Sequence, residues 1–123
     1  MPAVEVVYYR EGDRIPMVEW LARLSPDDCD VCIAHLRWLK QKGYEMRRPL
    51  ADYLTDGIYE LRAKRRGVNY RMLYFFHGSR AVVVTHGFAK QCSRVPGSEI
   101  RRAHDRMASF KADPVAHTFI TGV

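Results

Sequence analysis

The fold of this chain is decided by the segment DGIYELRAKRRGVNYRMLYFFHGSRAVVVTHGF, residues 56–88. It holds three runs rich in β-branched and aromatic residues, at 58–64, 68–77 and 81–88. Such runs, separated by short breaks that contain glycine, are typical of consecutive antiparallel strands. The breaks Arg66-Gly67 and Gly78-Ser79 are the predicted hairpin turns. The segment therefore predicts a three-stranded antiparallel meander.

A first strand and two helices are predicted before this meander. Residues 4–9 (VEVVYY) are typical of a strand. Apolar residues recur at helical spacing over 15–24, which predicts a short helix. A second helix is predicted from Ser25, its N-cap, through Pro26 at the first helical position to Gly43 at its end. The buried stripe of this helix is predicted to contain Cys29, Cys32, Ile33, Leu36 and Leu39.

The other segments are predicted as a polar connection and a last helix. Residues 44–56 are expected to be a polar connection that ends in the turn pair Asp56-Gly57. A helix is expected at 96–112, and Asp113-Pro114 ends it. The predicted order is β-α-α-β-β-β-α. This is an α+β fold in which an antiparallel sheet carries an αα-hairpin and a C-terminal helix.

Length and composition are those of an ordinary globular protein. The chain has 123 residues, 47% hydrophobic and 28% charged, so we expect one domain over residues 1–123 with a single core. No apolar run approaches the roughly 18 residues of a membrane span, and the N-terminus lacks the pattern of a signal peptide. Three cysteines do not make a disulfide framework. We therefore expect a cytoplasmic protein.

Charge is distributed unevenly along the chain. Residues 1–60 hold 8 Lys and Arg against 11 Asp and Glu, a net charge of −3. Residues 61–123 hold 12 against 3, a net charge of +9. The pI is about 9.5. Such asymmetry indicates an anionic partner for the second half, or else a basic face that only serves solubility.

The hairpin turns predict a row of side chains across the sheet. A two-residue turn at Arg66-Gly67 places Arg62 opposite Arg71. A two-residue turn at Gly78-Ser79 then places Arg71 opposite His86. These three side chains are therefore expected on one face of three adjacent strands. Further along the same face we expect Phe88 and Lys90.

Two directly opposed arginines suggest a binding site. Opposed like charges destabilise a sheet, so a sheet that keeps them is suited to holding an anion between them. Guanidinium groups match phosphate oxygens and a charge-rich transition state. The alternative is that Glu60 and other carboxylates neutralise the pair.

Four motifs then resemble, in their order and spacing, those of a known family: DGIYELR (56–62), YRMLYFF (70–76), HGFAK (86–90) and PGSEI (96–100). Over roughly residues 4–112 the chain resembles the RelE/ParE-like toxins of bacterial type II toxin–antitoxin pairs, in particular their phage-derived, HigB-like branch. The resemblance implies a ribosome-dependent mRNA endonuclease that inhibits translation. It also implies two partners, a cognate antitoxin of the helix-turn-helix type and mRNA on the ribosome.

The resemblance implies that Arg62, Arg71 and Lys90 occupy the basic positions that these toxins use on RNA. Metal-free RNA cleavage needs a base for the 2′-hydroxyl, positive charge on the phosphorane and an acid for the 5′-oxygen. The two arginines are expected to stabilise charge, and Lys90 to do the same or to carry the proton. His86, whose ordinary pKa lies near neutrality, is the candidate base or acid. We expect neither a metal nor a cofactor, because Glu60 is the only carboxylate expected on this face.

The chain departs from the HigB-like pattern after its phenylalanine. That branch usually has two lysines and a threonine or serine there, whereas Phe88 is followed by AKQC at 89–92. Gln91 and Cys92 thus stand where a cation and a hydroxyl are usual. Arg94 is the candidate replacement for the missing cation.

Further contacts are expected around the row. At the first hairpin tip Lys64, Arg65 and Arg66 are expected either to hold RNA backbone or to be a solvated turn. Phe88 is expected to stack on a base or to close the core. The pair Cys29-x-x-Cys32 has the spacing of a metal or redox motif. Its helical spacing places both thiols on the apolar stripe, so we expect buried cysteines without metal.

Two other functions stay open at this point. Members of the RelE/ParE-like superfamily also include toxins that poison DNA gyrase, so a binding-only toxin is one alternative. The other is an inactive relative that serves as an antitoxin ligand.

Overall fold

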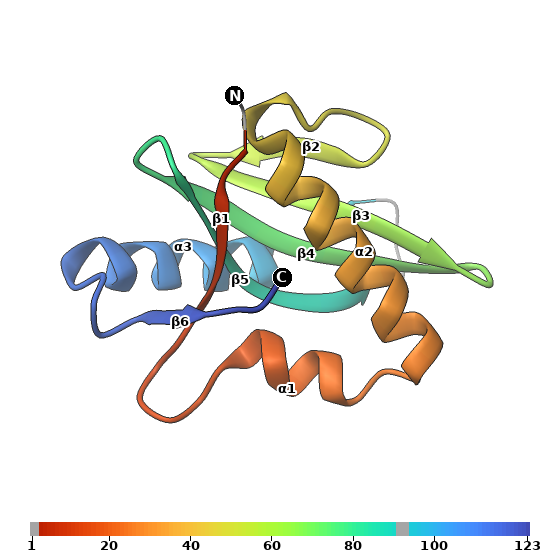
Figure 1. Ribbon diagram of the computed structural model, residues 1–123, viewed down its shortest axis with the longest axis horizontal. Coiled ribbons are helices and arrows are strands. Elements are labelled where there is room, and N and C mark those ends of the chain that lie inside the picture. Colours follow the sequence, from red (N-terminus) through yellow and green to blue (C-terminus); the bar gives the residue numbers. More distant parts are fainter. Residues whose placement is uncertain (1–2, 91–93) are drawn as a thin grey trace.

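Residues 3–90 and 94–123 are described by a computed structural model (Figure 1). Along the chain its elements are β1 (Glu5–Tyr9), α1 (Pro16–Ala22), α2 (Pro26–Lys42), the 3-10 helix η1 (Gly43–Glu45), β2 (Ala51–Thr55), β3 (Ile58–Arg65), β4 (Val68–His77), β5 (Ala81–Lys90), α3 (Gly97–Ala112) and β6 (Thr118–Ile120). None of the helices in these ranges is long and apolar enough to span a membrane.

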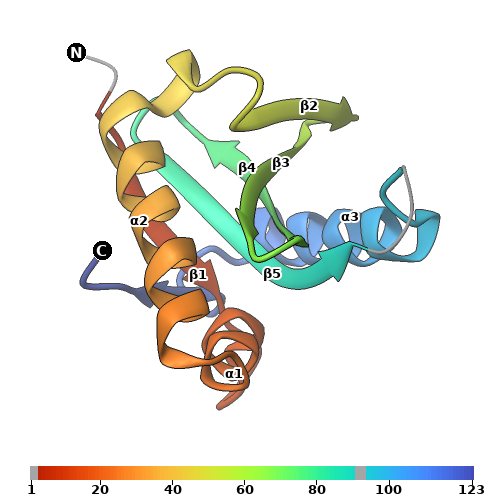
Figure 2. The ribbon, with the colours of Figure 1, turned by 90° about the vertical axis from the view of Figure 1, so that its right-hand side faces the viewer.

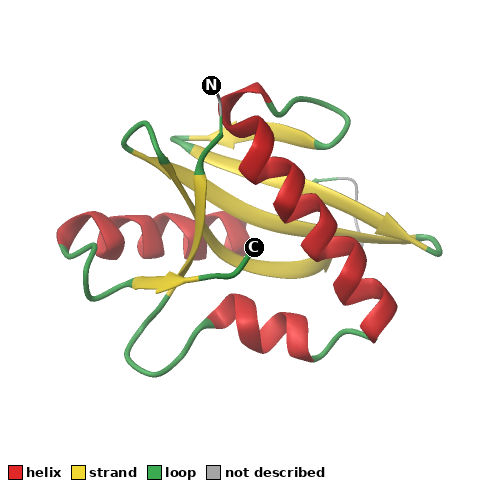
Figure 3. Ribbon diagram, viewed as in Figure 1, coloured by secondary structure: helices red, strands yellow, loops and turns green. Residues whose placement is uncertain are grey.

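One six-stranded sheet organises the molecule, in the order β2-β3-β4-β5-β1-β6 (Figure 3). Strands β2 to β5 form an antiparallel meander. β1 pairs with β5 in parallel, and β6 pairs with β1 antiparallel. The predicted α+β class is confirmed. The sheet is mixed rather than wholly antiparallel, because the two helices that follow β1 carry the chain to the far edge of the sheet before the meander begins.

The helices cover both faces of the sheet (Figure 2). α1 and α2 lie on one face, over a core that includes Val6, Trp20, Leu36, Leu61, Met72 and Val84. α3 lies on the other face, over a smaller core that includes Val7, Ile58, Leu73, Phe75, Val83 and Phe110. The sheet therefore separates two apolar layers, and side chains that alternate along each strand enter one layer or the other.

Helix α2 begins and ends as its sequence predicts. The Ser25 hydroxyl accepts a hydrogen bond from the Asp28 amide at 3.2 Å, and Pro26 takes the first helical position. Gly43 ends the helix with φ of +53°, a conformation that favours glycine. The predicted apolar stripe is confirmed, with Cys32, Leu36 and Leu39 fully buried.

Two strands were not predicted from the sequence. β2 lies inside the predicted polar connection at 44–56, and β6 follows the last helix. Both are short edge strands, and Ala51 is the one buried residue among their eight, so neither has the burial of a central strand. β2 forms because Asp56 and Gly57, with φ of +48° and +87°, make a tight turn that returns the chain onto β3.

Helix α1 approaches the sheet closely at a glycine of β5. The Trp20 ring is 7% exposed and packs edge-on against Tyr70, with ring centroids 5.7 Å apart. A Cβ atom at Gly87 would lie 2.3 Å from Trp20 Cε3. Only a residue without a side chain leaves room for this buried indole.

We predict that Gly87→Ala lowers the free energy of unfolding by about 1–3 kcal/mol, because an added methyl group overpacks the Trp20 contact. Urea denaturation measures this loss. Gly97→Ala, where an added Cβ meets nothing within 4 Å, is the matched control and should change the stability little. Equal stabilities of the two variants would contradict the close approach of α1.

Candidate functional site

On the face of the sheet that carries α3, part of the surface of β2 to β5 is formed by polar and charged side chains. Strand pairing places Arg62, Arg71 and Phe88 side by side on β3, β4 and β5. One flanking row consists of Asp52, Glu60, Leu73 and His86, and the other of Lys64, Asn69 and Lys90. We call the first of these three rows the arginine row.

The predicted register is correct in one hairpin and wrong in the next. Arg62 pairs with Arg71, as the turn at Arg66-Gly67 predicts. Arg71 pairs with Phe88 and not with His86, which pairs with Leu73. Two one-residue differences cause this. The turn between β4 and β5 holds three residues, and a β-bulge shifts the pairing after Leu73. Each difference by itself would turn the later side chains of β5 to the opposite face of the sheet. Because there are two, their effects cancel, and His86 lies on the predicted face.

A buried carboxylate holds the two arginines together. Glu60 is 2% exposed. Its Oε1 accepts from Arg71 Nε at 2.9 Å, and its Oε2 accepts from Arg62 Nη2 at 2.9 Å and Nε at 3.2 Å. Arg71 Nη1 also donates to the Tyr70 carbonyl at 3.0 Å. Both guanidinium groups are therefore fixed by charge-assisted hydrogen bonds.

A second carboxylate extends this network to the edge of the sheet. Asp52 on β2 accepts from Arg62 Nη2 at 3.2 Å and from Arg48 Nη2 at 2.9 Å. The hydrogen bond from Arg48 lowers the pKa of Asp52 below its ordinary value. Arg48 and Asp52 were not predicted as site residues, because residues 44–56 were interpreted as a loop. The alternation of Ala51, Asp52 and Tyr53 is the signal that could have placed Asp52 on this face.

The network keeps a positive charge. It joins three guanidinium groups to two carboxylates, so one positive charge is in excess. Carboxylates therefore neutralise the arginine pair only in part, which is the alternative that the sequence left open. Lys64 and Lys90 add charge beside the row, and neither forms an ion pair within the described residues. A fixed pair of guanidinium groups flanked by lysines is suited to a phosphate oxyanion.

His86 is enclosed by the sheet and α3. Its side chain is 7% exposed, with Nε2 3.0 Å from Glu99 Oε1 and Nδ1 2.9 Å from Thr85 Oγ1. Burial lowers the pKa of His86 to about 4, and the nearby Arg106 charge contributes, while Glu99 opposes the shift. The imidazole is therefore neutral at pH 7, and both of its nitrogens have partners. This arrangement fastens β5 to α3.

The residues predicted to contact RNA around the row do not all lie on one surface. Lys64 and Arg66 are exposed at the β3–β4 tip. Arg65 points to the α2 face and forms ion pairs with Asp27 at 3.1 Å and Asp28 at 3.2 Å, so it fastens the tip to α2. Phe88 is half-buried and packs against the α3-side core.

The remaining expectations concern residues near the end of β5 and in α2. Arg94 is exposed. Gln91 and Cys92 lie outside the described residues. Cys32 is fully buried, and burial raises the pKa of its thiol to about 12. Cys29 is half-buried beside it. In the described ranges no three Asp, Glu, His or Cys side chains come together as metal ligands.

Comparison with known families gives a match over most of the chain. The model of the family described as phage derived protein Gp49-like (DUF891) matches residues 19–108. These residues run from α1 to α3 and contain every member of the arginine row and its flanking rows. The search of curated proteins found no match.

We predict that Glu60→Gln lowers the free energy of unfolding by about 3 kcal/mol, because it leaves the buried Arg71 guanidinium without its counterion. The loss is measured by urea denaturation. Glu19→Gln is the matched control, since the Arg14–Glu19 pair is exposed and water screens its charges. A Glu60→Gln protein as stable as this control would contradict the anchoring role of Glu60.

A second prediction concerns pH. Because the pKa of His86 is about 4 in the folded chain and near 6.5 when unfolded, the unfolded state binds the proton first as pH falls. The stability that neutral His86 supports is therefore present above pH 6.5 and lost as pH falls towards 4. We expect His86→Gln to flatten the stability profile in this window, as measured by urea unfolding. Nuclear magnetic resonance should show the imidazole titrating near pH 4, and a midpoint near 6.5 would contradict its burial.

Proposed function

The chain belongs to the phage-derived Gp49-like family, within the RelE/ParE toxin-like group, and on this premise we propose that it is the toxin of a type II toxin–antitoxin pair that cleaves mRNA on the ribosome. The observation that carries the proposal is the arginine row. Two guanidinium groups are held side by side by one buried carboxylate. Arg62 Nη1 and Arg71 Nη2 have no hydrogen-bond partner within the described residues.

In this mechanism the arginine row acts mainly through charge. The 2′-oxygen attacks the adjacent phosphorus as its proton passes to water, and the phosphorane that forms carries an extra negative charge that the two arginines stabilise. The bond from phosphorus to the 5′-oxygen then breaks. Their fixed geometry means that little reorganisation is needed during the reaction. Glu60 is a positioning residue here, because its two oxygens are occupied by the arginines.

Proton transfer is assigned differently from the expectation based on sequence. Lys90 lies one row from Arg71 on the same face and is the group proposed to protonate the 5′-oxygen. A neutral His86 with two engaged nitrogens is a poor general acid at pH 7. We therefore propose His86 as a positioning residue that holds β5 against α3. Lys64 and Arg66 are proposed to contact RNA backbone at the hairpin tip.

The partners follow from the same charges. A cognate antitoxin with an acidic or amphipathic segment would cover the arginine row and its flanking lysines. Opposite charges would speed its association, and apolar anchors would set its residence time. Salt should accordingly slow association near 0.1 M, where the Debye length is about 10 Å.

Binding to DNA gyrase without cleavage is the second candidate. The enclosure of His86 favours it, because the three rows, as described, then offer for proton transfer only lysines and carboxylates that are paired with arginines. An inactive antitoxin ligand has no observation of its own in favour.

We predict that the wild-type chain, expressed without antitoxin, arrests growth and cleaves mRNA in a translating extract. Arg62→Ala should reduce the cleavage rate by about 100-fold, since loss of one donor to a developing oxyanion has an effect of that order. Arg62 is the better choice for substitution, because it is more exposed than Arg71. Cleavage is measured by primer extension on the extracted mRNA.

Arg101→Ala is the matched control, because Arg101 is an exposed arginine on α3 and its loss changes the net charge equally. Circular dichroism verifies that both variants fold. Full cleavage by a folded Arg62→Ala protein would refute the role of the row. Growth arrest with DNA breaks and intact mRNA would favour gyrase as the target.

A further inference from the structure

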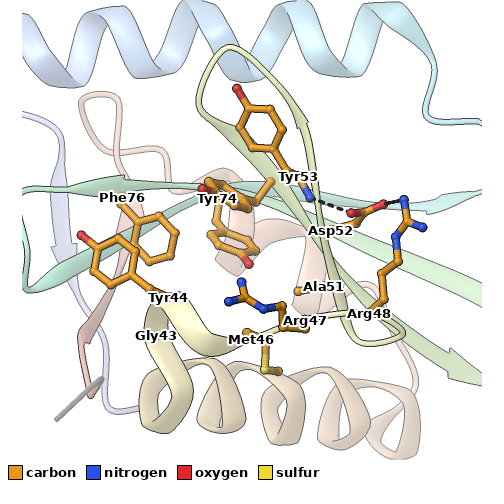
Figure 4. Close-up of a pocket in the computed structure, with 11 residues that line it drawn as sticks. Gly43, Tyr44, Met46, Arg47, Arg48, Ala51, Asp52, Tyr53, Tyr74 and Phe76 are labelled. Atoms are coloured by element: carbon orange, nitrogen blue, oxygen red, sulfur yellow. Dashed lines mark hydrogen bonds and ion pairs between the residues drawn. The ribbon is translucent and has the colours of Figure 1, made fainter.

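A second concave site lies on the opposite face of the sheet, between η1, β2 and the strands β3 and β4 (Figure 4). The cavity has a volume of about 370 Å³. Five aromatic side chains line it, Tyr44, Tyr53, Tyr59, Tyr74 and Phe76. We call it the aromatic pocket. Its volume is in the range of small-ligand sites, about 300–1,000 Å³.

The rings at the rim of the aromatic pocket are uncovered but fixed. Tyr44 is 45% exposed and Tyr53 52% exposed. The Tyr44 ring stacks on Phe76 with centroids 4.0 Å apart, and its hydroxyl donates to the Gly78 carbonyl at 2.6 Å. The Tyr53 hydroxyl accepts from the Gly57 amide at 3.0 Å. Both rings are therefore held in place without a ligand, which reduces the entropy lost on binding.

An arginine without a counterion accompanies these rings. Figure 4 shows the Arg47 side chain directed under the tyrosine rings, whereas Arg48 turns away towards Asp52. Arg47 is exposed, and its side chain has no ion pair or hydrogen bond within the described residues. The run KQKGYEMRR at 40–48 holds four cations and one carboxylate. The charge around the aromatic pocket thus complements an anionic ligand.

The aromatic pocket is also joined to the arginine row. Asp52 lines the aromatic pocket, and its carboxylate binds Arg48 at the pocket and Arg62 in the row. The two sites therefore share one residue at the β2 edge of the sheet. A single extended ligand that passes over this edge can contact both.

We propose that the aromatic pocket binds a base of single-stranded RNA, with Arg47 on the neighbouring phosphate, and so selects or positions the strand whose backbone lies on the arginine row. This inference rests on the proposed function. Stacking on fixed aromatic rings beside a cation is the usual way in which proteins hold single-stranded bases. A peptide of the antitoxin is the competing occupant, but it would need a carboxylate to match Arg47.

The test uses a 2′-O-methyl oligoribonucleotide of about ten nucleotides, which spans a typical single-strand site. It cannot be cleaved through its 2′-oxygen, so binding is measured apart from catalysis, by fluorescence anisotropy. Tyr44→Ala should weaken binding by about 5- to 100-fold, the effect of losing one stacked base. Arg47→Glu should weaken binding and also reduce its salt dependence.

Each variant has a matched control. Trp38→Ala removes an aromatic ring that is also 45% exposed but lies outside the aromatic pocket. Arg37→Glu makes the same charge change at another exposed arginine. Both controls should bind within about twofold of wild type. Tyr44→Phe, which keeps the ring, should also bind like wild type, and this separates stacking from a loss of folding.

The outcomes separate this inference from the proposed function. Unchanged oligonucleotide binding by folded Tyr44→Ala and Arg47→Glu proteins overturns the aromatic pocket as an RNA site, even if mRNA cleavage depends on Arg62. Loss of antitoxin binding with unchanged RNA binding overturns it too and assigns the pocket to a protein partner. If binding depends on Tyr44 and Arg47 but the wild type cleaves no mRNA, the aromatic pocket stands and the proposed function fails.

Discussion

The Glu60 carboxylate is the constraint on which the candidate site depends. Two guanidinium groups on adjacent strands repel each other, and burial of Arg71 would be costly without a counterion. One carboxylate between them offsets both penalties and leaves Arg62 Nη1 and Arg71 Nη2 without a partner among the described residues. The Glu60–Arg71 contact also fixes the pairing of β3 with β4, because a slip of one residue would move Arg71 to the other face, away from Glu60. Stability of the hairpin and charge of the site are thus linked in one ion-pair network.

The two faces of the sheet carry different candidate sites. The α3 face presents the arginine row, where positive charge is concentrated and held. The α2 face presents the aromatic pocket, where rings are uncovered beside Arg47. Asp52 at the β2 edge connects the two through its ion pairs with Arg48 and Arg62. An edge strand that looks like a minor addition to the sheet therefore supplies the link between both sites.

The sequence predicted the parts of this arrangement that follow from local rules. The turn Arg66-Gly67, with φ of +51° and +81°, sets the β3–β4 register, so the Arg62–Arg71 pair was predictable. The three-residue turn between β4 and β5 and the bulge after Leu73 have no comparable signal, and the predicted pairing of His86 was therefore wrong. β2 and its residue Asp52 were missed because an edge strand needs little apolar content. The low pKa of His86 arises from burial by α3, which no pattern within β5 encodes.

The β4–β5 hairpin affects how this chain should be aligned with related sequences. Its three-residue turn and its bulge are two length differences that cancel in their effect on which side of the sheet His86 occupies. Either one alone would turn the far half of β5 over, so the two differences compensate each other only as a pair. A relative with a shorter turn and no bulge would preserve the architecture with two fewer residues. If an alignment with such a relative contained a gap of only one residue in this hairpin, it would match His86 with a residue on the other side of the sheet.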